Sequence, residues 1–465
     1  SYDQIILHTQ AVADYLKMEN PTNLFTRKPH KASGVFPIIR GLIGDMIGPN
    51  SPMPIMDLRN GKDELQFLKR NDLEELSTRG TASPDHVIRI KGRPLVLRES
   101  VWSQGREAIK EELDKYAEEY KAMFERQAPH ADQSKTMLPT DPKNIWMEGI
   151  GLIGLGANAK AASIAGDLVV QNARVRAIGE DAGGFRPISE KDLFDCEYWS
   201  LEQAKLGKGA PPKFQGKVVM ITGGSGTIGF AIAEAFSKLG AQTILVDKDE
   251  IALKESVAKL GVGHKYFPID VTHSDAANQA MLAAINNFGG LDILISNAGA
   301  AHAGPMLGIS NEELRNAFEL NFFSHYSFST EAAKILKDQN RGGQILFNIS
   351  KQAVNPGKNF GAYGLPKATT FFLMRQLALE LGSDGIRVNG INADRIRSGL
   401  LTDDFISSRA KSRGVSESEY MAGNLLNKEV TAEHVADAFT ALACAESTTG
   451  HVITVDGGNI EASLR

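Results

Sequence analysis

Short apolar runs rich in β-branched residues alternate with helical patterns throughout the second half of the chain. Runs of this length, bounded by turn residues and separated by amphipathic stretches, are typical of strands in βαβ units. The rhythm predicts an α/β domain built on a parallel, doubly wound sheet. The runs are Val218 to Thr222, Ile244 to Asp247, Tyr266 to Asp270, Ile293 to Asn297, Ile345 to Ile349, Ile386 to Asn392 and His451 to Val455.

The first half is less regular, and its pattern is mostly helical with a few extended stretches. The clearest amphipathic helix is predicted over Glu107 to Arg126, with its charges on the outer face. Two extended stretches are predicted, at Asp85 to Ile90 and at Trp146 to Leu155, and the second runs into a helical pattern over Asn158 to Gln171. We therefore expect a mostly helical, mixed α/β N-terminal domain.

A segment rich in glycine, proline and lysine, Lys205 to Pro212, separates the two patterns and has the composition of a linker. A chain of 465 residues exceeds what one core usually supports, so more than one domain is expected. The predicted division is an N-terminal region at 1–206, a linker at 207–213 and the α/β domain at 214–465.

Composition narrows the functional classes. With 42% hydrophobic and 23% charged residues the chain is typical of globular proteins, and a net charge of −5 without a basic cluster argues against nucleic acid or an anionic membrane as partner. No long apolar run or secretory segment is seen, so a cytoplasmic location and a small-molecule partner are expected. The two cysteines and the scattered histidines have no metal-ligand spacing, so no metal site is predicted.

A glycine-rich turn follows the first predicted strand of the α/β domain and leads directly into a helix. The turn comprises Gly223, Ser225, Gly226, Thr227, Ile228 and Gly229. Glycines let the backbone approach a pyrophosphate, and the helix N-terminus offers it free N–H groups and a positive dipole end. This order predicts a dinucleotide site.

An acidic residue, Asp247, ends the second predicted strand at close to the ~20-residue spacing typical of a ribose-binding carboxylate. A carboxylate accepts hydrogen bonds from a ribose diol but repels a 2′-phosphate, so NAD is favoured over NADP, with neighbouring Lys248 as the residue that weakens this preference. Val271 and Asp270, after the third strand, are expected to line the adenine pocket. A turn or helix cap is an equally good interpretation of Asp270.

Tyr363 and Lys367 lie one helical turn apart, so both can face one cleft, and Ser350 precedes them at the end of a predicted strand. Hydride transfer at a carbinol carbon needs a group that moves the hydroxyl proton, and a nearby ammonium lowers the pKa of a phenol toward working pH. Tyr363 is therefore the expected acid/base, Lys367 the residue that tunes it, and Ser350 the hydrogen-bond partner of the substrate oxygen.

Together with the glycine turn and the strand end Asn297-Ala298-Gly299, these residues resemble the short-chain dehydrogenase/reductase family from Phe214 to Arg465. The resemblance implies a seven-stranded Rossmann-type sheet and a homo-oligomer, a dimer or tetramer. It also implies cofactor contacts from Asn297, Ala298, Gly299 and Ile396, and a catalytic role for Asn321 in holding a proton-relay water.

The segment Asn392 to Ser398, which contains Ile396, departs from the Pro-Gly that this family usually has there. The loop before Tyr363 is also unusually polar. One interpretation is solvated loop charge; another is a polar or anionic substrate held by Lys351, or by Arg395 and Arg397 in a lid, with His302 also facing the substrate.

Phrases in the first half, such as Ser83 to Arg89, Gly151 to Gly156 and Glu197 to Leu206, resemble the bifunctional rhamnulose-1-phosphate aldolase/alcohol dehydrogenase family. That family joins a metal-dependent class II aldolase to a dehydrogenase acting on lactaldehyde. The histidines expected for the aldolase metal are not found here, so we expect no aldolase activity. We also expect the chain to be either a fragment of a longer protein or a member of a lineage that lost that domain.

The sequence thus predicts an NAD-dependent oxidoreductase acting on a small hydroxy-aldehyde, polyol or sugar-derived alcohol. The alternatives are a noncatalytic NAD-binding assembly module and a piece of a bifunctional enzyme acting on an anionic sugar derivative. Two further features have structural interpretations as well as functional ones: Gly151 to Gly156 as a second nucleotide site or as packing, and His86 as a functional or a structural group.

Overall fold

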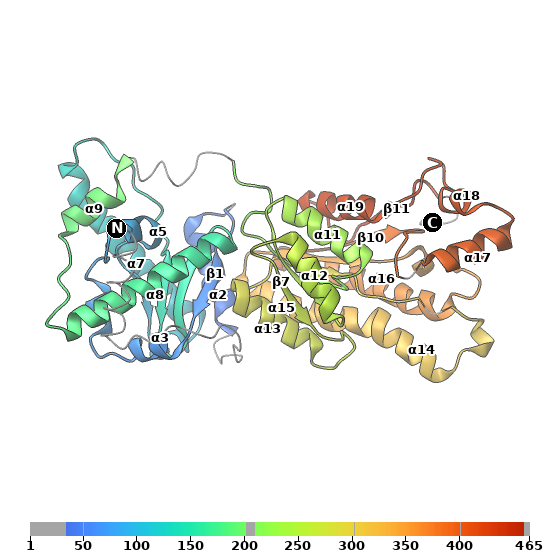
Figure 1. The fold of residues 1–465 in the computed structure, drawn as a ribbon, viewed down its shortest axis with the longest axis horizontal. Coiled ribbons are helices and arrows are strands. Elements are labelled where there is room, and N and C mark those ends of the chain that lie inside the picture. Colours follow the sequence, from blue (N-terminus) through green and yellow to red (C-terminus); the bar gives the residue numbers. More distant parts are fainter. Residues whose placement is uncertain (1–33, 50, 201–209, 302, 400, 460–465) are drawn as a thin grey trace, which may run out of the picture. The chain divides into compact units, whose positions relative to one another are not determined.

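The computed structural model describes residues 34–49, 51–200, 210–301, 303–399 and 401–459. They form two sheets, one of four strands and one of seven, each with helices packed on it (Figure 1). None of the helices in these ranges combines the length and apolar character that a membrane crossing needs. Residues 207–209 of the predicted linker lie outside these ranges, and the boundaries given for it stay predictions.

The seven-stranded sheet is parallel throughout, with order β11-β10-β9-β8-β5-β6-β7. Every apolar run of the second half forms a strand, which confirms the predicted α/β fold. The strands are β5 (Val218–Thr222), β6 (Gln242–Asp247), β7 (Lys265–Pro268), β8 (Ile293–Ser296), β9 (Gly343–Asn348), β10 (Ile386–Ala393) and β11 (Val452–Val455).

Helices cover both faces of this sheet, and this explains why its strands read as continuous apolar runs. In β5, Val219 and Ile221 face one core, and Val218 and Met220 face the other. The first core is closed by α11 (Thr227–Lys238), α12 (Glu250–Leu260) and α19 (Ala432–Cys444), and the second by α13 (Ala276–Phe288), α15 (Ser324–Gln339) and α16 (Gly361–Leu381).

The chain order reverses between neighbouring strands β5 and β8, because β6 and β7 lie on one side of β5, while β9, β10 and β11 lie beyond β8. A reversal of this kind opens a crevice at the carboxyl ends of the strands, which is where ligands bind in open α/β sheets. Three further helices lie beside this edge: α14 (Asn311–Phe318), α17 (Asp403–Arg413) and α18 (Glu417–Met421).

The four-stranded sheet has the order β1-β4-β3-β2, with one parallel pair, β2–β3, and two antiparallel pairs. Helices outnumber strands in this region, as predicted. The strands are β1 (Ile55–Arg59), β2 (Leu95–Leu97), β3 (Asn144–Met147) and β4 (Gly151–Gly156). The helices are α3 (Lys62–Phe67), α4 (Leu73–Ser77), α5 (Pro84–Ile90), α6 (Glu99–Trp102), α7 (Arg106–Gln127), α8 (Ala159–Asp181) and α9 (Glu190–Glu197).

The glycines of β4 let a helix approach the strand closely. A Cβ on Gly154 would lie 2.2 Å from the Gly166 nitrogen of α8, and one on Gly156 would lie 2.2 Å from the Ala162 nitrogen. The glycine-rich stretch is itself a strand rather than a loop that follows one. Its glycines therefore serve packing, the structural interpretation of the two considered from the sequence.

The prediction of an extended stretch at Asp85 to Ile90 is wrong, because these residues belong to helix α5. Ser83 has extended dihedrals at the N-cap position and Pro84 occupies the first helical turn, two features that favour a helix start. His86 is buried in this helix with its Nδ1 2.6 Å from the Ser83 hydroxyl, which supports a structural role.

Helix α2 (Phe36–Ile47) packs on α15 of the seven-stranded sheet, although the sequence places it in the N-terminal region. A Cβ on Gly41 would lie 1.9 Å from the Gln339 carbonyl oxygen, so only glycine fits this approach. Arg40 is fully buried and forms a 2.8 Å ion pair with buried Asp292. One core cluster thus joins α2 to the helices of the second sheet.

Candidate active site

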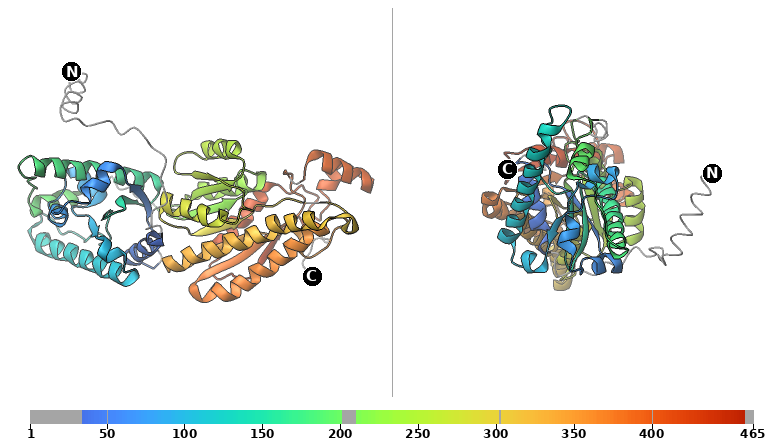
Figure 2. Two further views of the ribbon diagram at one scale, coloured as in Figure 1. Left: turned by 90° about the horizontal axis from the view of Figure 1, so that it is seen from below. Right: turned by 90° about the vertical axis from the view of Figure 1, so that its left-hand side faces the viewer.

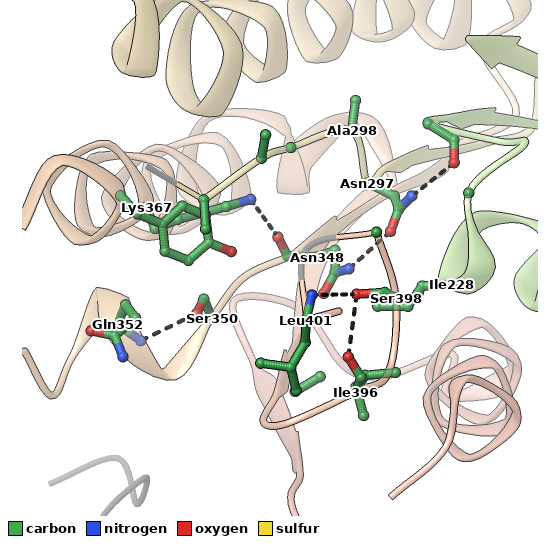
Figure 3. Close-up of a pocket in the computed structure, with 18 of the residues that line it drawn as sticks. Ile228, Asn297, Ala298, Asn348, Ser350, Gln352, Lys367, Ile396, Ser398 and Leu401 are labelled. Atoms are coloured by element: carbon green, nitrogen blue, oxygen red, sulfur yellow. Dashed lines mark hydrogen bonds between the residues drawn. The ribbon is translucent and has the colours of Figure 1, made fainter. Parts of the chain in front are cut away.

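A cavity of about 980 Å³ lies at the carboxyl ends of β5, β8 and β9. The residues predicted for the cofactor site line it, except Ser225. Ser350, Tyr363 and Lys367 line the same cavity, so the structure brings the two predicted sites together (Figure 3). His302 lies outside the described residues, and nothing is stated of its position.

The glycine turn has the backbone that a nucleotide cradle needs. Gly223 adopts a φ of 64°, in the left-handed region that favours glycine. A Cβ on Gly229 would lie 2.1 Å from the Gly223 carbonyl oxygen, so α11 can start this close to β5 only with glycine there. The α11 N-terminus therefore faces the cavity with a bare backbone, which fits a pyrophosphate.

Ser225 supports Asp247 instead of lining the cavity. The Ser225 hydroxyl donates to Asp247 Oδ2 at 2.7 Å, and the backbone N–H of Lys248 donates to Oδ1 at 2.8 Å. The carboxylate is thereby held at the cavity wall, at the end of β6. A pre-oriented carboxylate at this position suits a ribose diol.

Asp270 caps a turn and also lies on the cavity wall. Its Oδ1 accepts hydrogen bonds from the Thr272 N–H at 3.0 Å and from the Thr272 hydroxyl at 2.7 Å, which is a turn cap. The hydrogen bonds from Thr272 lower the pKa of the Asp270 carboxyl although burial opposes them. Asp270 and Val271 also line the cavity next to Asp247.

Tyr363 and Lys367 are both buried in the first two turns of α16. Burial raises the pKa of the Tyr363 phenol, and its hydrogen bond with the Ser350 side chain opposes this rise. Burial also lowers the pKa of the Lys367 ammonium to about 8. The Lys367 Nζ lies 5.9 Å from the centre of the Tyr363 ring, so the charge state of one group influences the other.

Asn321 occupies a π-helical turn, Glu319–Phe323, between α14 and α15. Its amide nitrogen donates to the Ala300 and Ala317 carbonyls, at 3.0 and 3.1 Å. Its buried Oδ1 has no hydrogen-bond partner among the described residues. Buried polar atoms of this kind commonly bind an ordered water, so the site fits the water expected from the family resemblance.

Two neighbours of Lys367 were not found from the sequence. Lys367 Nζ donates to the Asn348 carbonyl at 3.1 Å (Figure 3). The same Nζ lies 3.4 Å from His325 Nε2. The Asn348 amide also donates to Asn297 Oδ1 at 2.8 Å. Register could have indicated Asn348, since β8 and β9 are adjacent parallel strands that pair Ser296 with Phe347, and the next residues along the two chains are Asn297 and Asn348. The position of His325, one helical turn after Asn321, could have indicated a shared helix face.

His325 is buried and holds its ring by a 2.6 Å contact between Nδ1 and the Ser296 hydroxyl. Burial, with the Lys367 charge as a second cause, lowers the pKa of this histidine well below its usual value. A neutral imidazole beside Lys367 adds no positive charge that would disfavour the ammonium.

The segment after β10 forms side-chain ion pairs and hydrogen bonds that proline and glycine, the usual residues there in the family, have no side-chain groups to make. Lys351 Nζ forms a 2.8 Å ion pair with Asp394 Oδ1, and Asn459 donates to Oδ2 at 2.6 Å. Arg395 adopts a φ of 54° and donates to the Tyr420 carbonyl at 2.8 Å. Ile396 is buried and lines the cavity, as predicted for a cofactor contact.

Of the three cationic residues proposed from the sequence to bind the substrate, two line the cavity and one does not. Lys351 and Arg395 line the cavity, but their charged ends are engaged with Asp394 and with Tyr420. The prediction that Arg397 faces the substrate is wrong, because Arg397 does not line the cavity. Its guanidinium pairs with Glu429 at 2.7 Å and with Asp403 at 2.6 Å. Opposite charges outside the cavity hold it away.

In the ranges that the structure describes, no group of three or more His, Cys, Asp and Glu residues lies close enough together to hold a metal ion.

Comparison with known proteins identifies two regions. Residues 224–459 match the family model described as enoyl-(acyl carrier protein) reductase, and residues 30–206 match the second domain of class II aldolases. YuxG of Bacillus subtilis, an uncharacterized oxidoreductase, is 31% identical over 445 residues, which cover 92% of this chain. The chain spans 63% of YuxG's length.

The second half has further relatives. Secoisolariciresinol dehydrogenase of Forsythia intermedia is 30% identical over 53% of this chain and 90% of its own length. The structure of L-sorbose reductase from Gluconobacter frateurii, complexed with NADPH and L-sorbose, matches 54% of this chain and 98% of that one, with 28% identity and a TM-score of 0.50. The chain therefore belongs to the short-chain dehydrogenase/reductase family of oxidoreductases, with a class II aldolase second domain preceding the reductase module.

Proposed function

We propose that the chain is an NAD(H)-dependent dehydrogenase that interconverts a small polyol or sugar-derived alcohol, or a hydroxy-aldehyde such as lactaldehyde, with its oxidised or reduced partner. The observation that carries the proposal is the joint burial of Tyr363, Lys367 and Ser350 on the wall of one cavity, next to the bare glycine turn.

Each of the catalytic residues has a separate role in proton transfer. The phenolate oxygen of Tyr363 takes the proton of the substrate alcohol in oxidation, and the resulting hydroxyl returns it in reduction, while the Ser350 hydroxyl hydrogen-bonds the same substrate oxygen. A protonated Lys367 favours the phenolate form of Tyr363, which offsets the effect of burial on the tyrosine. Asn321 holds a water behind Lys367 through its free carbonyl oxygen, and this water connects the lysine to solvent protons.

The glycine turn, Asp247 and Ile396 would hold the cofactor, which when bound supplies the hydride-accepting nicotinamide. NAD is the proposed cofactor because Asp247 would repel a 2′-phosphate at the ribose. The NADPH in L-sorbose reductase belongs to that protein, and Lys248 at the cavity wall is the residue here that could favour a phosphate. Cofactor preference therefore depends on the balance between these two neighbouring side chains.

A polyhydroxylated substrate is supported by two observations. The cavity wall around Tyr363 is polar, with Ser350 and Gln352 among its residues. L-sorbose, a sugar, is bound in the structure of L-sorbose reductase, a family member with a similar fold. Lactaldehyde is proposed from the sequence resemblance to aldolase/dehydrogenase fusions, and the match to a class II aldolase domain supports that relationship.

A second candidate function is suggested by that same domain, since the fusion would couple aldol cleavage to oxidation of the aldehyde released. The expectation that this chain has no aldolase activity stays a prediction. A coupled assay with rhamnulose 1-phosphate, with and without added zinc, tests it. Dihydroxyacetone phosphate formed by the purified chain would contradict the prediction.

The test of the proposed function is NADH formation at 340 nm with lactaldehyde, 1,2-propanediol, sugar alcohols and hydroxy acids, and with NADP in parallel. We expect NAD-dependent turnover of at least one polyol or hydroxy-aldehyde. Tyr363→Phe should lower kcat by about 10²- to 10⁴-fold, because it removes the proton-transfer group. NADH binding, followed by its fluorescence, should persist in this variant. Full turnover by Tyr363→Phe would support the noncatalytic alternative for these residues.

A further inference from the structure

The substrate side of the cavity carries positive charges that the proposed function does not use. Helix α17 contributes Arg409 and Arg413 to the cavity wall, and the loop before α16 contributes Lys358. None of the three side chains has an ion pair or hydrogen bond to another described residue. Lys351, Arg395 and Arg397, by contrast, are all engaged with protein groups.

Aromatic rings support the two arginines instead. The Arg409 guanidinium lies 5.2 Å from the centre of the Phe360 ring and 5.5 Å from that of Phe405. The Arg413 guanidinium lies 5.4 Å from the centre of the Tyr420 ring. Contact with a ring orients a guanidinium but leaves its N–H donors in the plane free to bind a planar or tetrahedral anion.

Placing these charges together has a cost. Arg409 and Arg413 are one turn apart on the same face of α17, and like charges at this spacing destabilise a helix. The negative end of the helix dipole favours cations in the last turn, but Lys411, which does not line the cavity, serves that purpose equally well. The dipole therefore does not explain why both arginines face the cavity.

Acidic groups of the cavity do not neutralise this wall. Asp394 is engaged by Lys351, Asn459 and Arg395. Asp247 and Asp270 belong to the cofactor end and are fixed there by Ser225 and Thr272. Of the carboxylates on α17 and α18, Asp403 pairs with Arg397 and Glu419 caps α18, and no ion pair joins Asp404 or Glu417 to the two arginines among the described residues.

We propose that Arg409, Arg413 and Lys358 form a subsite for an anionic group on the substrate, so that the enzyme prefers phosphorylated or carboxylated hydroxy-aldehydes and alcohols over neutral ones. The proposal rests on the proposed function, because it assigns the substrate class of that cavity. A phosphate and a carboxylate share the chemistry that two guanidinium groups recognise, bidentate hydrogen bonding to paired oxygens.

The proposed anion subsite is tested by comparing the turnover of paired substrates that differ in one anionic group. With NADH, the pair glyceraldehyde and glyceraldehyde 3-phosphate isolates a phosphate, and the pair butanal and 4-oxobutanoate isolates a carboxylate. We expect kcat/KM to be about tenfold or more higher for the anionic member of at least one pair, the size of one charge-assisted contact. The pair that shows the preference identifies the anion.

Variants assign the preference to the residues. In Arg409→Gln/Arg413→Gln the ratio of kcat/KM between the anionic and neutral members should fall to near one, mainly through KM. Lys411→Gln removes a charge from the same helix away from the cavity, and should keep the wild-type ratio. The proposal is overturned if wild type shows no preference for either anion, or if the double variant keeps the preference.

Binding separates failure of this proposal from failure of the proposed function. If no member of either pair is turned over, calorimetric titration of glycerol 3-phosphate and of glycerate into NADH-loaded protein still decides. Binding of either anion by wild type, weakened by about tenfold or more in Arg409→Gln/Arg413→Gln and retained in Lys411→Gln, supports the subsite. Absence of binding, or equal binding by the double variant, overturns it even where neutral substrates are turned over.

Discussion

Asp247 is oriented by the protein itself, because the Ser225 hydroxyl and the Lys248 N–H donate to its two oxygens. A side chain fixed in this way loses little rotational freedom when a ribose binds, and it cannot easily turn aside for a phosphate. Cofactor choice is therefore a property of one residue and its immediate partners, and it can be tested at that residue.

The substitution Asp247→Ala should remove both the hydrogen-bond acceptor for the ribose hydroxyls and the charge that repels a 2′-phosphate. Hydrogen bonds to a charged group are worth about 1.5–3 kcal/mol, so kcat/KM with NAD should fall by roughly 10- to 100-fold. The ratio of NAD to NADP activity should shift toward NADP, measured at 340 nm with both cofactors. Glu250→Gln, an exposed carboxylate nearby at the start of α12, is the control and should leave the ratio unchanged. An unaltered ratio in Asp247→Ala would contradict this role.

Residues that share one element could be predicted from the sequence, and residues that meet only in space could not. Tyr363 and Lys367 are one turn apart on α16, and the glycine turn is continuous in the chain. His325 and Asn348 reach Lys367 from two other elements, so their approach to the lysine depends on how these elements pack and not on a spacing within α16. For Arg397 the sequence indicated a charge near the lid but could not indicate that Glu429 would bind it.

Elements follow the same rule. The strands of the large sheet could be predicted because burial on both faces requires unbroken apolar runs, as in β5 and β8. Helix α5 was mistaken for an extended stretch because it contains three β-branched residues, Val87, Ile88 and Ile90, while the Ser-Pro pair at its start favours a helix. The packing of α2 on α15 could not be predicted at all, since it depends on the distant contact of Arg40 with Asp292.

This contact between elements should contribute strongly to stability. Arg40 also donates to the carbonyls of Pro54 and Gly216 and to Gln339 Oε1, so its loss leaves several buried acceptors unpaired. Arg40→Met should lower the free energy of unfolding by about 3–5 kcal/mol, measured by urea denaturation. Lys238→Met, which removes an exposed ion pair with Glu234, should cost less than about 1 kcal/mol. A similar small loss for both variants would show that the buried pair stabilises little.

For the whole molecule, the sequence predicted a homo-oligomer only through family resemblance, and the structure offers a surface that suits one. Helices α15 and α16 lie side by side on one face of the large sheet (Figure 2). Leu365, Phe372 and Leu379 recur every seven residues along α16 and are 47%, 61% and 81% exposed. Residues at this spacing share one helix face, so they form an apolar stripe that a lone chain leaves in water.

We propose that a second copy of the chain covers this stripe, giving a dimer or a tetramer. Size-exclusion chromatography with light scattering should then report at least twice the 50.3 kDa of one chain. Phe372→Glu/Leu379→Glu should shift the mass toward one chain, because pairing would bury two carboxylates on each copy in an apolar contact. Val262→Glu is the matched control, since Val262 is 91% exposed but lies in the turn after α12, away from the stripe. A wild-type mass of one chain at micromolar concentration would exclude this assembly, and an unchanged mass in the double variant would move the interface elsewhere on the surface.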